Sequence, residues 1–174
     1  MFKKSVGNVL LRGAALGGRF VLLLAISKYL TPGDLGVYGV FSVTISIALL
    51  VLGLEFYTFN TREIPGRELK EQAIRIRDQA IFHGVGYGFV LPSFLVPFLG
   101  GFLDWKHVVW FYAVLVVEHV SQELFRILVA ISQSVRANLV YFVREGAWVG
   151  ALVVLYWLVP QERHILWVWR FWVA

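Results

Sequence analysis

Cysteine is absent from the 174 residues, and charged residues make up only 16% of them. Without a thiol the chain has no disulfide, no thiolate metal site and no cysteine nucleophile. A soluble domain carries roughly a quarter of its residues as Asp, Glu, Lys or Arg, so this chain has few charges to face water. Hydrophobic residues account for 59% of the chain, and its mean hydropathy is +0.72. The composition therefore predicts a protein whose surface lies mainly in lipid.

Long apolar runs divide the chain, and charged stretches or proline and glycine separate them. A transmembrane helix needs about 20 mostly apolar residues. The predicted spans are residues 6–30, 35–59, 80–103, 108–131 and 140–159. Residues 61–79 are strongly charged and predict a loop with a short amphipathic helix over 69–78, and residues 165–174 predict the start of a sixth span. We expect one all-α transmembrane domain, a polytopic bundle of five spans plus this partial sixth.

The positions of lysine and arginine predict the orientation of these spans. With the N-terminus in the cytoplasm, nine basic residues fall in cytoplasmic segments and only Lys106 and Arg163 fall in external loops. Basic residues favour the cytoplasmic side of a membrane, so a cytoplasmic N-terminus is expected. The net charge of +5 does not indicate nucleic acid, because the basic residues lie at helix ends and do not share one exposed face.

Two arginines lie within the first predicted span. Arg12 and Arg19 are seven residues apart, about two helical turns, so they project from one face together with Asn8. Such charges are costly in a bilayer and mark functional-site candidates. They form either a cationic stripe for an anionic substrate, or an interfacial Arg12 with an Arg19 that pairs with an acid on another helix.

The fourth predicted span carries a polar stripe that cannot face lipid. Its members are Glu118, His119, Gln122, Glu123 and Arg126. The stripe predicts either substrate contact and an ion or proton relay, or a Glu118–Gln122–Arg126 network that satisfies only itself. Arg144 and Glu145, at the inner end of the fifth span, are expected at the membrane interface.

Other motifs predict packing and give no support for an enzyme. Gly13 and Gly17, with Gly18 beside them, have the G-x-x-x-G spacing that allows close helix packing. His119 and Glu123 alone are too few ligands for a metal site. No phosphate-binding loop or nucleophile motif is present in the sequence, so we expect no cofactor and no enzymatic activity.

Two stretches carry a resemblance to a known family. Residues 28–39, K-Y-L-T-P-G-D-L-G-V-Y-G, resemble the first external turn of bacterial polysaccharide flippases, where L-x-P-x-x-x-G-x-Y joins two helices. Residues 53–64, G-L-E-F-Y-T-F-N-T-R-E-I, resemble that family's G-L-acid…R-E segment near the inner end of the second helix. The chain thus resembles the N-terminal portion of a polysaccharide or O-antigen flippase of the multidrug/oligosaccharidyl-lipid/polysaccharide exporter superfamily.

The resemblance implies two helical lobes around a cationic cavity in the bacterial inner membrane. The implied substrate is an undecaprenyl-diphosphate-linked oligosaccharide, carried across the membrane in a process coupled to an ion gradient. Arg19, Arg126 and Arg12 are then the substrate-binding candidates, and Glu118, His119 and Glu123 the ion-coupling candidates. The implied partners are membrane lipid, the lipid-linked glycan and a second lobe or partner chain.

Two other functions stay open at the level of sequence. The unfinished sixth span favours a non-transporting membrane subunit or an inactive truncated fragment. A membrane-embedded sugar or acyl transferase would need a site in a long loop, and residues 61–79 are the one predicted loop of that length.

Overall fold

The computed structural model describes residues 2–53 and 56–174, which form an all-helical bundle without a strand. The elements are α1 (Phe2–Tyr29), α2 (Pro32–Gly53), α3 (Phe56–Glu63), α4 (Leu69–Ser93), α5 (Val96–Leu99), η1 (Trp105–His107), α6 (Val108–Ala130), α7 (Ser134–Phe142), the π-helical η2 (Val143–Ala147), α8 (Trp148–Leu158), η3 (Pro160–Glu162) and α9 (Ile165–Val173).

Among the described residues, four helical segments are long and apolar enough to cross a membrane: Gly7–Tyr29, Pro32–Gly53, Leu69–Leu99 and Ser134–Leu158. Their outer faces are apolar as well, with Phe89 75% exposed and Leu50 69% exposed. Monomeric soluble proteins rarely expose apolar surface on this scale, whereas lipid covers it at no cost. The chain is therefore a helical membrane protein. Helix α6, which matches the fourth predicted span to within one residue, is not among these four segments.

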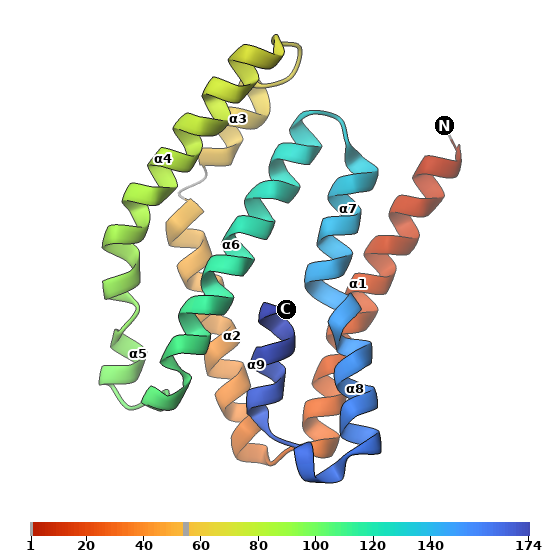
Figure 1. Cartoon of the computed structure of the whole chain (residues 1–174), viewed down its shortest axis with the longest axis vertical. Helices are drawn as coiled ribbons and strands as arrows, with labels where there is room; N and C mark the ends of the chain where they lie inside the picture. The colour runs from red at the N-terminus through yellow and green to blue at the C-terminus, as the bar shows by residue number, and fades with distance from the viewer. Residues whose placement is uncertain (1, 54–55) are drawn as a thin grey trace.

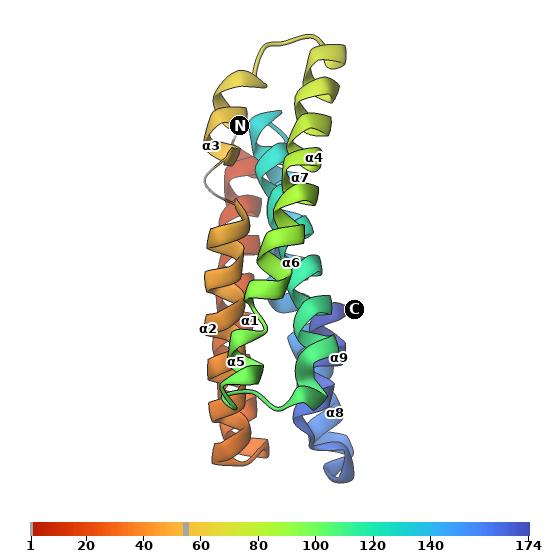
Figure 2. The same ribbon diagram turned by 90° about the vertical axis from the view of Figure 1, so that its left-hand side faces the viewer.

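The long segments alternate in direction along the bundle. The N-terminus, the α3–α4 connection and the α6–α7 turn lie at one end (Figure 1). The α1–α2 turn and the α8–α9 connection lie at the opposite end, and Figure 2 shows the same arrangement from the side. α6 occupies the middle of the bundle in Figure 1, between α4 and the α7–α8 segment, so its side chains can contact neighbours on both sides.

The α1–α2 turn is built by a helix cap. The Thr31 hydroxyl accepts a hydrogen bond from the Asp34 backbone N–H at 3.1 Å, and the Asp34 carboxylate accepts from the Thr31 N–H at 3.2 Å. This reciprocal pair is a capping box, which satisfies backbone donors that the first helical turn leaves open. Pro32 begins α2, a position where its missing N–H costs nothing. The motif predicted as a turn therefore also starts the second helix.

The predicted boundary between the charged segment and the third span is wrong. The short amphipathic helix over 69–78 and the first part of the third span form one helix, α4, because no proline or glycine interrupts residues 69–83. α4 ends at Ser93, just after Pro92. The second predicted span, 35–59, corresponds to α2 and the first residues of α3, which are the described segments on either side of residues 54–55. Leu54 and Glu55, part of the flippase-like second stretch, lie outside the described residues.

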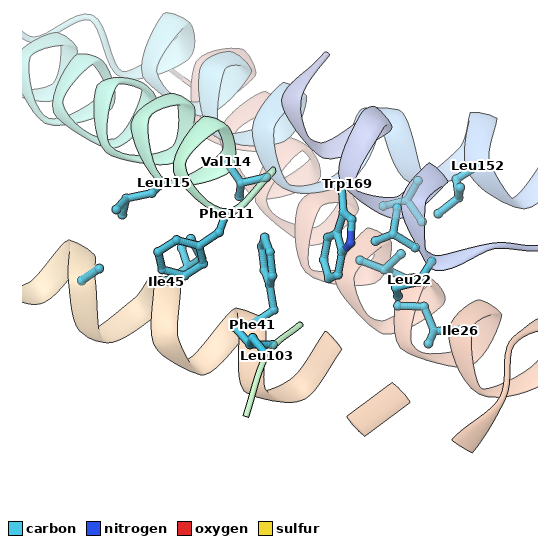
Figure 3. Close-up of a cluster of buried hydrophobic side chains, with 14 of the residues drawn as sticks. Leu22, Ile26, Phe41, Ile45, Leu103, Phe111, Val114, Leu115, Leu152 and Trp169 are labelled. Carbon is cyan, nitrogen blue, oxygen red and sulfur yellow. The ribbon is translucent and has the colours of Figure 1, made fainter. Parts of the chain in front are cut away.

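The core is aromatic, and α9 supplies its largest side chain. The fully buried Trp169 stacks on Phe41 of α2, with ring centroids 3.9 Å apart. Phe41 in turn meets Phe111 of α6 edge to face at 5.4 Å. Figure 3 shows these rings in one cluster with Leu22 and Ile26 of α1. The segment predicted as the start of a sixth span is thus the nine-residue helix α9, which packs into the bundle.

The closest helix contact joins α1 to η2. A Cβ added at Gly18 would lie 2.6 Å from the Cα of Gly146, and a Cβ at Gly146 would lie 3.1 Å from the Cα of Ala15. Small residues allow such close approach between membrane helices. The predicted pair, Gly13 and Gly17, does not make this contact, because a Cβ at either would meet nothing within 4 Å. Gly18, one residue further along, is the glycine on the contact face.

Candidate functional site

Side-chain hydrogen bonds join helix α1 to the α7–η2 segment at three positions. Asn8 Nδ2 donates to Ser134 Oγ at 3.4 Å, Arg12 Nε donates to Asn138 Oδ1 at 3.0 Å, and Arg19 Nε donates to the Glu145 carboxylate. Each of these hydrogen bonds joins residues 126 positions apart, so the two segments run parallel and in register. Of the two interpretations of Arg19, the structure shows the pairing with an acid on another helix.

The π-helical turn η2 brings two charged residues into the bundle. The side chain of Arg144 is 12% exposed and that of Glu145 is 4% exposed. Single π-helical turns inside α-helices are rare and often occur at functional sites, because they change the direction of the side chains around them. Both side chains lie within the bundle, and their expected position at the membrane interface stays a prediction.

Four charged side chains form what we name the central ion network: Arg19, Glu118, Arg144 and Glu145. Arg144 contacts Glu145 and also lies 3.2 Å from Glu118, measured from Nε to Oε2. The Trp172 indole N–H donates to Glu118 at 2.6 Å, which adds α9 to the network. Two guanidinium groups and two carboxylates balance in formal charge, which lowers the cost of holding them inside an apolar bundle.

A cavity of about 260 Å³ adjoins the central ion network. Its wall contains all four network residues, four aliphatic residues and five other side chains. The aliphatic residues are Leu22 and Leu23 of α1 and Ile45 and Leu49 of α2, and the others are Tyr38, Ser42, Ser46, Trp148 and Trp172. Arg19 keeps 57% of its side chain exposed, whereas its partner Glu145 is buried. Arg19 can therefore contact a ligand in the cavity while its carboxylate partner stays in place.

A second polar group joins α4 to α6. One ligand atom from each of His83, His119 and Glu123 lies within 4.8 Å of the others, and all three residues are buried. We name these three residues the α4–α6 cluster. The His83 and His119 rings meet edge to face, with centroids 4.6 Å apart.

Neighbouring side chains orient the α4–α6 cluster. Gln79 and Arg126 both donate to the Glu123 carboxylate, one to each oxygen. Tyr87 Oη lies 2.7 Å from His119 Nδ1, a hydrogen bond whose donor depends on the histidine tautomer. A cavity of about 320 Å³ opens beside the cluster and is otherwise lined mainly by aliphatic side chains such as Ile127.

The structure therefore divides the stripe predicted on the fourth span between two sites. Glu118 belongs to the central ion network, and His119, Glu123 and Arg126 lie on the side of α6 that faces α4. Five residues of α-helix separate Glu118 from Glu123 by about 140° around the axis, whereas spacings of three or four keep residues on one side. The predicted Glu118–Gln122–Arg126 network is wrong, because Glu118 pairs with Arg144 and Arg126 pairs with Glu123.

Sequence reasoning missed His83, and it placed Arg144 and Glu145 outside the candidate site. His83 lies inside the third predicted span, where a titratable side chain is itself a signal of a functional or structural polar site. Its nearness to His119 depends on how α4 packs on α6. Arg12, Arg19 and Arg126 are not brought together, since Arg126 lies in the other cluster.

Comparison with known proteins found no match to the chain among protein-family models, curated proteins or solved structures. The resemblance to polysaccharide flippases therefore stays a prediction from residues 28–39 and 53–64, and the chain belongs, on its structure, to the all-helical membrane proteins.

Proposed function

We propose that the chain is part of a transporter that moves an undecaprenyl-diphosphate-linked oligosaccharide across the bacterial cytoplasmic membrane. The observation that carries this proposal is the cavity beside the central ion network, where two guanidinium groups line a polar space inside an apolar bundle. The head group of such a substrate is anionic and polar, so its path through lipid needs positive charge that is shielded from the acyl chains.

Arg19 and Arg144 can bind the diphosphate if its oxygens replace the carboxylate oxygens that these guanidinium groups now contact. A guanidinium group presents a planar fork of donors that fits phosphate oxygens as well as carboxylate oxygens. Arg12 lies two turns before Arg19 on the same helix, and its described partner is the neutral amide of Asn138. Arg12 therefore extends the cationic face toward the N-terminal end of α1. Arg126 is the more distant substrate candidate because it pairs with Glu123 on the side of α6 that faces α4.

Ion coupling is assigned to carboxylates next to these arginines. Protonation of Glu118 would remove one of the two negative charges that Arg144 contacts, so that only Glu145 would compete with the substrate for this guanidinium. His119 and Glu123 keep their proposed role as ion-coupling candidates, now as a site separate from Glu118. Transport by alternating access requires a second lobe or partner chain against which this bundle moves.

A membrane topology of five spans with a cytoplasmic N-terminus completes the proposal. The observed ends of the bundle agree with it, because Arg67 and Lys106 lie in connections at opposite ends (Figure 1). Arg67 precedes α4, and its hydrogen bonds to Glu71 of α4 and Glu63 of α3 raise the pKa of its guanidinium above the usual value. Arg67 therefore keeps its positive charge at physiological pH, and positive charge favours the cytoplasmic side of a membrane.

The topology predicts opposite labelling of two single-cysteine variants. The chain has no native cysteine, so Glu71→Cys and Lys106→Cys each carry one thiol, at positions whose side chains are 56% and 66% exposed. An impermeant maleimide added to intact cells should label Lys106→Cys and leave Glu71→Cys unlabelled until the cells are opened. Labelling of both variants in intact cells would contradict the proposed orientation.

Substitution of Arg19 tests the function. In its native gene context, Arg19→Ala should abolish polysaccharide export in a flippase-deficient strain, and Arg19→Lys should retain part of it, because lysine keeps the charge but loses the planar fork. Arg136→Ala is the matched control, since Arg136 is exposed and bonds Gln133 outside both sites. Protein levels in the membrane are measured by immunoblot alongside export.

A non-transporting subunit is the alternative, and one observation favours it: the central ion network balances its own charge. That function predicts full export by Arg19→Ala at normal membrane levels, or loss of the protein because Glu145 is left without Arg19. Full export by a well-expressed Arg19→Ala protein would contradict a substrate-binding role for Arg19.

A further inference from the structure

The α4–α6 cluster has the composition of a metal site. Two imidazoles and one carboxylate form a ligand set that proteins use for Zn²⁺ and for other divalent transition metals. His83, His119 and Glu123 are each less than 9% exposed, and they come from two helices, so the backbone holds them in place. His107 and His164, the other two histidines of the chain, lie outside this cluster.

The spacing of the ligand atoms is close to that of a bound ion. The three atoms lie within 4.8 Å of one another. Zn²⁺ binds such ligands at about 2.0–2.2 Å, which places neighbouring ligand atoms roughly 3.3–3.6 Å apart in a tetrahedral site. Side-chain movements of about 1 Å close this difference and need no change in the helices.

The Nε2 atom of His119 is placed to bind a metal ion. Its Nδ1 is engaged by Tyr87 at 2.7 Å, and its Nε2 is buried without a hydrogen-bond partner among the described residues. A buried polar nitrogen without a partner costs free energy, so its presence calls for a ligand. When Nδ1 donates to Tyr87 Oη, the lone pair of Nε2 is free to bind a metal. This is the usual arrangement of a metal-binding histidine, whose second nitrogen is held by an outer hydrogen bond.

We propose that His83, His119 and Glu123 bind one divalent transition-metal ion, with Zn²⁺ as the preferred ion and water from the adjoining cavity as the remaining ligand. The cavity of about 320 Å³ contacts all three residues and has room for that water. The bound ion would link α4 to α6. Metal binding and the proposed transport are independent and are measured separately.

Arg126 sets the affinity of this site. Its guanidinium pairs with the Glu123 carboxylate and so competes with a metal ion for the same ligand, and its positive charge repels a divalent cation. Arg126 also lies beside Gly53 of α2, since a Cβ at Gly53 would be 3.4 Å from its Nη1.

Titration of the purified protein in detergent tests the proposal, with ZnCl₂ followed by calorimetry and CoCl₂ followed by visible absorption. We expect one equivalent to bind, with a Co²⁺ spectrum of four- or five-fold coordination. His83→Ala and His119→Ala should each weaken binding by more than about 100-fold, and Tyr87→Phe by about 10-fold, as for outer partners of metal-binding histidines. His164→Ala, at an exposed histidine, is the matched control and should bind as the native chain does.

Arg126→Gln separates metal binding from a purely structural cluster. Removing the competing charge should tighten Zn²⁺ binding, and a gain in affinity cannot arise from misfolding. This keeps the test decisive where a histidine variant does not fold. Absence of saturable binding by the native chain, binding that survives both histidine substitutions, or weaker binding by Arg126→Gln would each overturn the proposal.

Discussion

Gly18→Val is expected to unfold or strongly destabilise the bundle, whereas Gly17→Val should melt as the native chain does. The atoms nearest to an added Cβ at Gly18 are the backbone Cα and carbonyl oxygen of Gly146, at 2.6 and 3.3 Å, and backbone cannot rotate out of the way. The helices must therefore separate. Overpacking costs about 1–3 kcal/mol in well-packed cores, and more where backbone must move. The adjacent Arg19–Glu145 pair would separate as well.

Thermal unfolding in detergent, followed by circular dichroism, measures this difference. Gly17 is the matched control because it is the neighbouring residue, in the same helix, and a Cβ there meets nothing within 4 Å. Both substitutions change helix propensity equally, so propensity cancels in the comparison. Equal melting temperatures for the two variants would show that α1 does not approach η2 at Gly18.

Arg144→Met is the second substitution with a large expected effect. Arg144 is the residue that contacts both carboxylates of the central ion network, so its loss leaves Glu118 without a described cationic partner. Removing one member of a buried ion pair costs about 3–5 kcal/mol, because a charge is then buried without compensation. Arg136→Met, at an exposed arginine, should leave the stability within about 0.5 kcal/mol of the native value.

A compensating substitution tests whether a buried, unpaired carboxylate causes the loss of stability in Arg144→Met. Adding Glu118→Gln to Arg144→Met restores the charge balance and leaves the Arg19–Glu145 pair in place, so the double variant should be more stable than Arg144→Met alone. The free energy of unfolding of the two single variants and the double variant, measured in the same detergent, gives the coupling between the residues. If the double variant is less stable than Arg144→Met, the two side chains are not held together by charge.

The sequence by itself determined the helical class and the position of most helices. In lipid a backbone must satisfy its own hydrogen bonds, so a run of apolar residues of sufficient length specifies a helix wherever it occurs. Residues 108–131 were predicted as a span, and α6 covers Val108–Ala130. The α1–α2 boundary was likewise readable, because Thr31, Pro32 and Asp34 act within one helical turn. The sequence did not reveal that the helix of the third span already begins within residues 61–79, because charged residues do not end a helix as proline does.

Only the tertiary structure decided which charged residues meet. The pairing of Arg19 with Glu145 joins residues 126 positions apart, and the register of α1 on α7–η2 depends on the close approach of Gly18 and Gly146. Likewise His83 becomes a neighbour of His119 through the packing of α4 on α6. Helix formation is a local property of a few consecutive residues. The choice of partners depends on side-chain volumes and charges from distant segments at once, which no single stretch of sequence contains.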